Sequence, residues 1–160
     1  MYRTFALVFV VTVLWACGKA PNSDAQRGAD QLTGANAVPA DTNPVCKLFG
    51  PDELEPYAGE PLQEGKTAAM GSGCQWLAKD DDGDVLIQIV PKDYHRDPSL
   101  ADGYRELPDI GVKGNVTPDM GGWIAAAIVG EESVIASVAG QGANADQAVA
   151  LLRETIKRRG

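Results

Sequence analysis

The chain contains two pairs of short apolar runs, and each pair is joined by a turn too short to hold a helix. The first pair covers residues 74–79 and 84–90, and the second covers residues 123–129 and 133–139. Strands joined this closely pair antiparallel as hairpins. The Asp-Gly pair at 82–83 is typical of a tight hairpin turn. The sequence therefore predicts an antiparallel sheet built from two hairpins.

Two helices are expected to flank the hairpins. Pro51 and the acidic residues after it are typical of a helix start, because proline tolerates the first position and acids suit the helix dipole. Gly59 ends that helix near residue 58. A longer helix is expected after Asn144, with Gln147 completing a capping box. Apolar residues recur at helical spacing from there to Ile156, which predicts one buried face.

This order of elements indicates an α+β domain. We expect an antiparallel sheet of about four to five strands, with the short N-terminal helix and the C-terminal helix packed on one face. Residues 65–73 are expected to form a loop, and residues 93–106 a loop with room for one helical turn. A short segment around Val116 is expected to pair with the second hairpin.

The chain begins with the pattern of an export signal. Arg3 precedes an apolar stretch of about a dozen residues, which is too short for a permanent span because a bilayer requires roughly 20. The junction Leu14-Trp15-Ala16-Cys17 resembles a lipobox, from which Trp15 departs because a small residue is usual there. We therefore expect residues 1–16 to be a signal peptide and Cys17 to carry the acyl chains of a bacterial lipoprotein. A plain secreted protein or a short buried helix is the alternative.

Composition divides the remainder into a tether and one domain. Residues 17–43 are rich in Gly, Pro, Asn and Ala and are expected to form the lipidated cysteine and a disordered linker. Residues 44–160 are expected to form a single α+β domain. Arg3 is the only charged residue among the first sixteen, so removing them changes the net charge from −8 to about −9. That acidity argues against nucleic acid as a partner, and it requires membrane attachment to come from the acyl chains on Cys17.

Cys46 and Cys74 are the two cysteines other than Cys17. An even pair suits an oxidising compartment, where a disulfide is the favoured interpretation. Such a bridge would stabilise the domain by roughly 3.5 kcal/mol in the chain-entropy model. Free thiols or a metal pair are the alternatives, although two cysteines and the single His95 make a poor zinc site.

Several short motifs resemble a widespread family of actinobacterial lipoproteins that is known as a domain of unknown function. They are Pro44-x-Cys46-x-Leu48, the acidic helix ending at Gly59, Gly73-Cys74-Gln75-Trp76 and Leu107-Pro108-Asp109-Ile110-Gly111. The similarity spans most of residues 44–158. The resemblance implies a paired Cys46 and Cys74, a sandwich-like α+β domain and no catalytic residues.

Motifs that suggest cofactor or metal chemistry fail on their context. Residues 140–145 read G-x-G-x-x-A between a strand and a helix, but the chain ends before the further strand and acid of a dinucleotide site. The acidic run at 80–84 lacks carboxylates at the first and last positions of an EF-hand loop. We therefore expect no cofactor and no metal.

Catalytic side chains are equally hard to assemble from the sequence. His95 is expected to be exposed in a loop, and Glu131-Glu132 to lie on a turn. No serine lies in a nucleophile elbow. Trp76 and Trp123 are expected in the core rather than on a binding surface. We therefore expect no enzyme, although an uncharacterised envelope hydrolase remains an alternative.

The sequence thus favours a non-catalytic binding or interaction module of the cell envelope, lipid-anchored on the extracytoplasmic face of a membrane. In a host with two membranes, Gly18 after the cysteine resembles outer-membrane sorting. Its partner would be an envelope protein or a cell-wall component. The alternative is a carrier or sensor of a small apolar ligand, because the small residues Ala125–Ala127, Ala136 and Ala139 could leave a pocket. They could equally let a helix approach closely.

Overall fold

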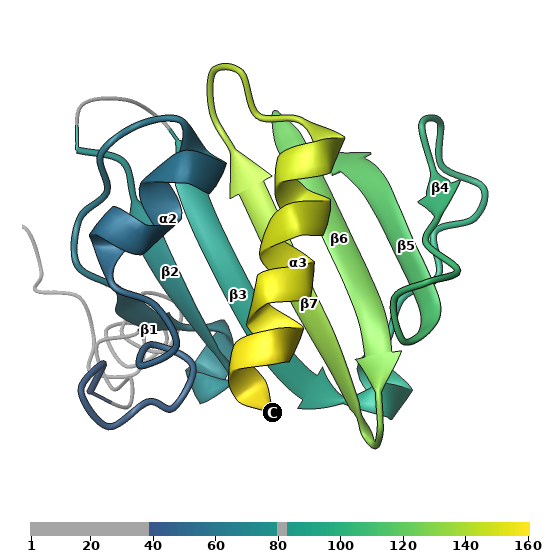
Figure 1. Cartoon of the computed structure of the whole chain (residues 1–160), viewed down its shortest axis with the longest axis horizontal. Coiled ribbons are helices and arrows are strands. Elements are labelled where there is room, and N and C mark those ends of the chain that lie inside the picture. The colour runs from purple at the N-terminus through teal and green to yellow at the C-terminus, as the bar shows by residue number, and fades with distance from the viewer. Residues whose placement is uncertain (1–38, 80–82) are drawn as a thin grey trace, which may run out of the picture.

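The computed structural model describes residues 39–79 and 83–160, which form an α+β domain. A seven-stranded antiparallel sheet runs behind two α-helices (Figure 1). The predicted signal peptide, Cys17, most of the predicted linker and the acidic residues 80–82 lie outside the described residues. The elements in chain order are α2 (Pro51–Ala58), β1 (Lys66–Ala68), η1 (Ala69–Gly71), β2 (Gly73–Leu77), β3 (Asp84–Pro91), η2 (Lys92–Tyr94), β4 (Arg105–Glu106), β5 (Val112–Asp119), β6 (Gly122–Val129), β7 (Glu132–Ala139) and α3 (Ala145–Arg159).

Both helices begin where local sequence signals predict. The side chain of Asn144 accepts hydrogen bonds from the backbone N–H groups of Asp146 and Gln147, both at 3.1 Å, and Gln147 accepts one from Asn144. In α2, Glu53 accepts a 2.8 Å hydrogen bond from the N–H of Gly50. Gly59 ends α2 in the left-handed conformation at φ 80°, which glycine adopts without strain.

The strands are ordered β1-β2-β3-β7-β6-β5-β4, so the last strand of the chain lies in the middle of the sheet. β7 pairs with β3 on one side and with β6 on the other. The two predicted hairpins, β2–β3 and β6–β7, are present and meet along the β3–β7 pair. The chain therefore crosses from β3 to the far edge of the sheet before it returns through β5 and β6.

The predicted sheet of four to five strands was too small. Two very short strands form at its edges: β1, within the predicted loop 65–73, and β4, at the end of the predicted loop 93–106. The segment around Val116 is the full strand β5. Strands of two or three residues leave no readable alternation of apolar and polar side chains, so only pairing with a longer neighbour defines them.

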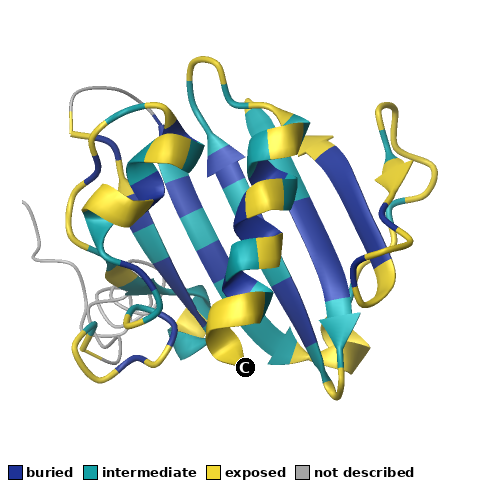
Figure 2. Cartoon of the chain, in the orientation of Figure 1, coloured by how far each residue is buried: buried dark blue, intermediate teal, exposed yellow. Residues whose placement is uncertain are grey.

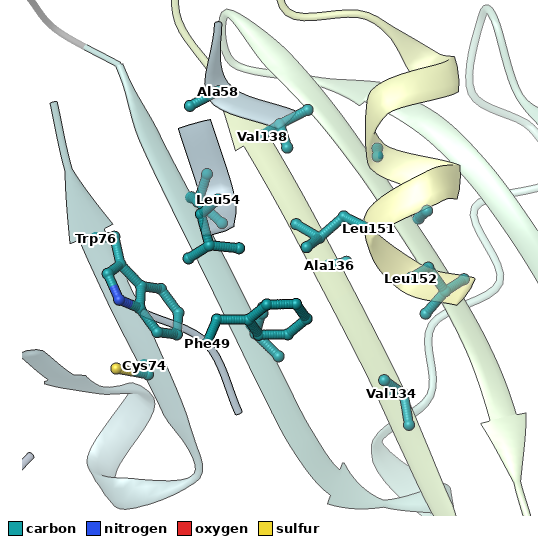
Figure 3. Packing of buried hydrophobic residues seen from close by; sticks show 14 of the residues in the cluster. Phe49, Leu54, Ala58, Cys74, Trp76, Val134, Ala136, Val138, Leu151 and Leu152 are labelled. Atoms are coloured by element: carbon teal, nitrogen blue, oxygen red, sulfur yellow. The ribbon is translucent and has the colours of Figure 1, made fainter. Parts of the chain in front are cut away.

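The core lies between the sheet and the two helices. Figure 2 shows buried and less buried bands alternating along the strands, as expected when successive side chains point to opposite faces. Val134, Ala136 and Val138 of β7 are fully buried beneath α3. Leu151 and Leu152 of α3 pack down onto that strand, and α2 adds Leu54 (Figure 3).

The small alanines in the sheet allow α3 to approach closely. Ala125, Ala127 and Ala136 have no exposed surface and belong to the cluster that contains Leu151 and Leu152. Helix side chains therefore fill the space above these alanines. Of the two expectations for them, a pocket or the close approach of a helix, the structure has the second.

The predicted disulfide between Cys46 and Cys74 is present. It joins the segment before α2 to the start of β2. Asn43 strengthens the same attachment: it is fully buried, and its amide nitrogen donates to the carbonyl oxygen of Gly73 at 2.9 Å and to the Thr67 hydroxyl at 3.2 Å. The folded part therefore includes Asn43, on the linker side of the predicted boundary at Pro44.

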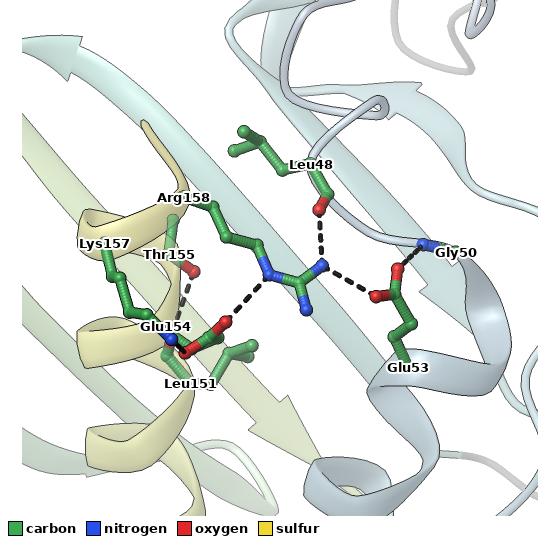
Figure 4. Close-up of polar contacts among 8 residues, drawn as sticks. All are labelled: Leu48, Gly50, Glu53, Leu151, Glu154, Thr155, Lys157 and Arg158. Carbon is green, nitrogen blue, oxygen red and sulfur yellow. Dashed lines mark hydrogen bonds and ion pairs between the residues drawn. The ribbon is translucent and has the colours of Figure 1, made fainter. Parts of the chain in front are cut away.

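Arg158 fastens the two helices to one another (Figure 4). Its guanidinium donates to the Leu48 carbonyl oxygen at 2.8 Å and lies 3.0 Å from Glu53 and 2.9 Å from Glu154. The same group stacks over the Phe49 ring at 4.1 Å. One long side chain thus satisfies two carboxylates and a carbonyl where α3 ends beside α2.

Candidate interaction surface

The sheet face opposite to α2 and α3, called here the open face, is the candidate functional surface. Along each inner strand the core side chains alternate with side chains on this face. The open face presents five branched aliphatic residues that are only partly buried and lie outside the core cluster. They are called here the aliphatic cluster: Leu86, Val90, Ile124, Ile128 and Ile135.

The strand register arranges the aliphatic cluster around the central strand. Ser137 of β7 lies between Leu86 of β3 and Ile124 of β6. Ser133 of the same strand lies between Val90 and Ile128. Four aliphatic side chains therefore occupy the corners of a block.

Ile135 stands at the centre of that block, between Gln88 and Ala126. The open-face positions within 86–90, 124–128 and 133–137 hold no charged residue. Contiguous uncharged surface with several large aliphatic side chains is typical of an interaction site, whereas single exposed apolar residues are normal.

The segment of residues 92–104, called here the crossover, borders the open face at one end. His95 attaches it: Nδ1 lies 2.9 Å from the Ser133 hydroxyl oxygen, and Nε2 lies 3.1 Å from the Lys113 carbonyl oxygen. A carbonyl only accepts, so Nε2 carries a proton and donates to it. Asn115, which is 2% exposed, also donates to the Lys113 carbonyl oxygen at 3.2 Å. Asn115 also donates to the carbonyl oxygen of Arg96 in the crossover at 3.4 Å, so the crossover is attached to both β7 and β5.

His95 therefore lies in a loop but is half-buried there and bonded on both ring nitrogens, rather than freely exposed. The sequence did not single out Asn43, Asn115 or Ser133. Each has a polar side chain buried by segments distant in sequence, and no local pattern marks such a position. A serine within a strand gives no signal that a histidine 38 residues away will cover it.

The first of two hollows lies where the crossover meets β4 and β5. It has a volume of about 210 Å³, and its lining includes Asp97, Tyr104, Glu106 and Lys113. Lys113 sits in a bulge between β5 and β6 with φ 55°, in the left-handed region. Partial desolvation and the carboxylates of Asp97 and Glu106 raise the pKa of the Tyr104 hydroxyl above its usual value.

A second hollow, of about 470 Å³, lies at the turn between β5 and β6. Trp123 lines it with Asp119 and Met120. Trp123 is partly buried and packs against the core, whereas Trp76 is 1% exposed and belongs to the core itself. Neither hollow lies between α3 and the sheet.

The described residues contain no cluster of three or more His, Cys, Asp or Glu side chains that could hold a metal ion. Glu131 and Glu132 each form an ion pair with a different cation. Glu131 pairs with Lys92, and Glu132 pairs with Arg159. No helix within residues 39–79 and 83–160 is long and apolar enough to cross a membrane.

Comparison with known proteins found no matching family model, no matching curated protein and no matching solved structure.

Proposed function

We propose that this chain is a lipid-anchored, extracytoplasmic lipoprotein whose folded domain is a non-catalytic binding module of the cell envelope. Its binding surface is the open face. The observation that carries the proposal is the aliphatic cluster, which stands partly exposed on three adjacent strands with no charge among the intervening positions. An uncharged aliphatic centre surrounded by polar residues is the usual layout of a protein-binding surface.

The hydrogen-bonded pair of Ser133 and His95 argues against catalysis. Ser133 and His95 are 2.9 Å apart, as a nucleophile and its base would be. However, Ser133 has no exposed surface, so a substrate cannot reach its hydroxyl. The second ring nitrogen donates to the backbone carbonyl of Lys113 instead of to an orienting carboxylate. The pair therefore acts as an attachment for the crossover.

The carrier alternative has less support. It requires a pocket between the sheet and the helices, and Leu151 and Leu152 fill the space above the alanines there. An envelope hydrolase would need acidic or nucleophilic groups that converge in a cleft. Asp97 and Glu106 line the hollow beside β4 and β5, outside the aliphatic cluster, and the hydroxyl of Ser133 is buried. The binding module is the function that accounts for the uncovered aliphatic surface.

The anchor is tested by Cys17→Ser in the full chain. If Cys17 carries the acyl chains, the variant no longer partitions with membranes, whereas the wild-type protein does. A matched Ser23→Ala variant in the predicted linker should behave as wild type. Membrane retention of the Cys17→Ser protein at the wild-type level would contradict the lipoprotein assignment.

The binding surface is tested by photo-crosslinking in the native host. A photo-reactive phenylalanine analogue replaces Ser137, on the central strand of the open face between Leu86 and Ile124, in the full chain. The control replaces Ala150, an exposed position on α3. We expect a discrete crosslinked species from position 137 and none from position 150. Equal or absent crosslinking at the two positions would overturn the proposed binding surface.

A further inference from the structure

We propose that the hollow at the turn between β5 and β6 binds a neutral sugar. The site goes beyond the proposed function, because none of its lining residues belongs to the aliphatic cluster. The proposal is carried by the position and size of the hollow, by the indole of Trp123 that lines it and by the charge of its lining.

The hollow lies between two loops at one end of the sheet. The β5–β6 turn lines it with residues 118–123, and the loop before α3 adds Ala143. The two loops are in contact, because the N–H of Gly140 donates to the carbonyl oxygen of Gly121 at 3.4 Å. The volume of about 470 Å³ lies within the range of roughly 300–1,000 Å³ that small-molecule sites occupy. The hollow can therefore hold a small ligand.

Two glycines leave bare backbone in the lining between Met120 and Trp123. Gly121 has φ 87°, in the left-handed region that favours glycine, and a side chain on Gly122 would collide with the backbone of Val138. The lining therefore presents peptide groups here instead of side chains. Peptide N–H and C=O groups form hydrogen bonds with hydroxyl groups of a ligand.

Trp123 supplies apolar surface beside this polar backbone. Trp76 is 1% exposed within the core, whereas Trp123 is partly exposed, lines the hollow and also packs against the core cluster. Contact with the core holds the indole in place, so little side-chain entropy is lost when a ligand binds to it. One face of a pyranose ring consists of C–H groups, which pack well on an aromatic surface.

The charge of the lining favours a neutral ligand. Among the described residues that line the hollow, Asp119 is the one that carries a charge. It is exposed, and within residues 39–79 and 83–160 no lysine or arginine forms an ion pair with it. A carboxylate accepts hydrogen bonds from sugar hydroxyls and repels anions, as does the net charge of −8.

A sugar suits this lining better than an organic cation does. Sites for quaternary ammonium groups are aromatic cages, in which several rings surround the charge. Among the described residues that line the hollow, Trp123 is the single aromatic side chain. One apolar surface, one carboxylate and exposed peptide groups match a ligand with a C–H face and a rim of hydroxyl groups.

The test is an NMR titration of the full chain in mild detergent with trisaccharides of N-acetylglucosamine, glucose and mannose. We expect at least one of them to shift the indole N–H signal of Trp123, with a dissociation constant on the order of 1 mM. The signal of the buried Trp76 should not move, and Trp123→Phe identifies which signal is which. No shift at Trp123 with any of the three up to about 20 mM would overturn the proposal. A shift confined to other residues would also overturn it.

Two conservative variants locate the sugar in the hollow. Asp119→Asn should weaken binding about fivefold, because an amide oxygen accepts hydrogen bonds less strongly than a carboxylate does. Trp123→Phe should weaken it about threefold, because the aromatic surface is smaller. Asp93→Asn changes an exposed carboxylate on η2, outside the hollow, and should bind as wild type. Wild-type affinity in both hollow variants, with folding checked by circular dichroism, would overturn the site.

This result and the crosslinking at position 137 are independent. A sugar that binds at Trp123 without any crosslink specific to position 137 supports the sugar site and overturns the open face as a binding surface. A specific crosslink without sugar binding has the opposite meaning.

Discussion

The two faces of the sheet are made by the same strands, yet they differ completely in what covers them. On β7, Val134, Ala136 and Val138 are fully buried under α3, while Ile135 and Ser137 between them are only partly buried. One face is closed by helices, a disulfide and the Arg158 contacts. Among residues 39–79 and 83–160, the crossover borders the other face at one end. The first face holds the contacts that stabilise the fold, and the second is the proposed binding surface.

The largest expected effect compares neighbouring residues on β3. Ile87 has no exposed surface and faces the helices, whereas Leu86 is partly exposed on the open face. Ile87→Ala should lower the free energy of unfolding by about 3 kcal/mol, because it removes buried methylene groups and leaves a cavity. Leu86→Ala should lower it by less than about 1 kcal/mol. Urea denaturation measures both, and equal losses would mean that the open face belongs to the core.

A middle effect tests the attachment of the crossover. Ser133→Ala removes the hydroxyl that bonds to His95 Nδ1 within a fully buried position. We expect a loss of about 1–2 kcal/mol, because the ring nitrogen then lacks its buried partner. Hydrogen exchange should accelerate in residues 92–104 with little change in α3. Ser137→Ala, on the same strand and face, is the matched control. Uniform acceleration across both regions would show that Ser133 does not act through the crossover.

The smallest effect concerns the polar contacts that hold the helices on the covered face. The Gly50 N–H and then Arg158 lower the pKa of Glu53, and Arg158 and Lys157 lower the pKa of Glu154, both below the usual 4.5. Carboxylates with lowered pKa values stabilise the fold above about pH 4.5, and this contribution is lost as the pH falls through their folded values.

Arg158→Gln should therefore reduce stability slightly at neutral pH and flatten its decline in acid. The measurement is the urea midpoint at several pH values between 7 and 3 for the variant and the wild type. Arg105→Gln is the control, because it removes an exposed ion pair with Asp146, which lies in the first turn of α3, away from Arg158. If the urea midpoint falls with decreasing pH equally in the wild type and in Arg158→Gln, these carboxylates do not contribute through Arg158.

Features set by neighbouring residues agree with the sequence predictions, whereas the features that differ are set by distant residues. The bounds of both helices, the two hairpins, the disulfide and the burial of Trp76 agree with the sequence predictions. The size of the sheet was wrong because β1 and β4 are too short to show a pattern. His95 was expected to be exposed, and instead it joins the crossover to β7 and β5. Its partners lie 38 and 18 residues away, beyond any local pattern.

The sequence by itself determined the elements whose signals lie within a few residues, such as the Asn144–Gln147 cap and the hairpin turn after Val129. These depend on hydrogen bonds and backbone preferences that neighbouring residues supply. The tertiary structure alone decided that β7 lies between β3 and β6, and so that Leu86, Ile124 and Ile135 share one face. The reason is physical. Strand order depends on pairing between distant segments, and the free energies of their burial and of loop closure cannot be read from any short stretch of the chain.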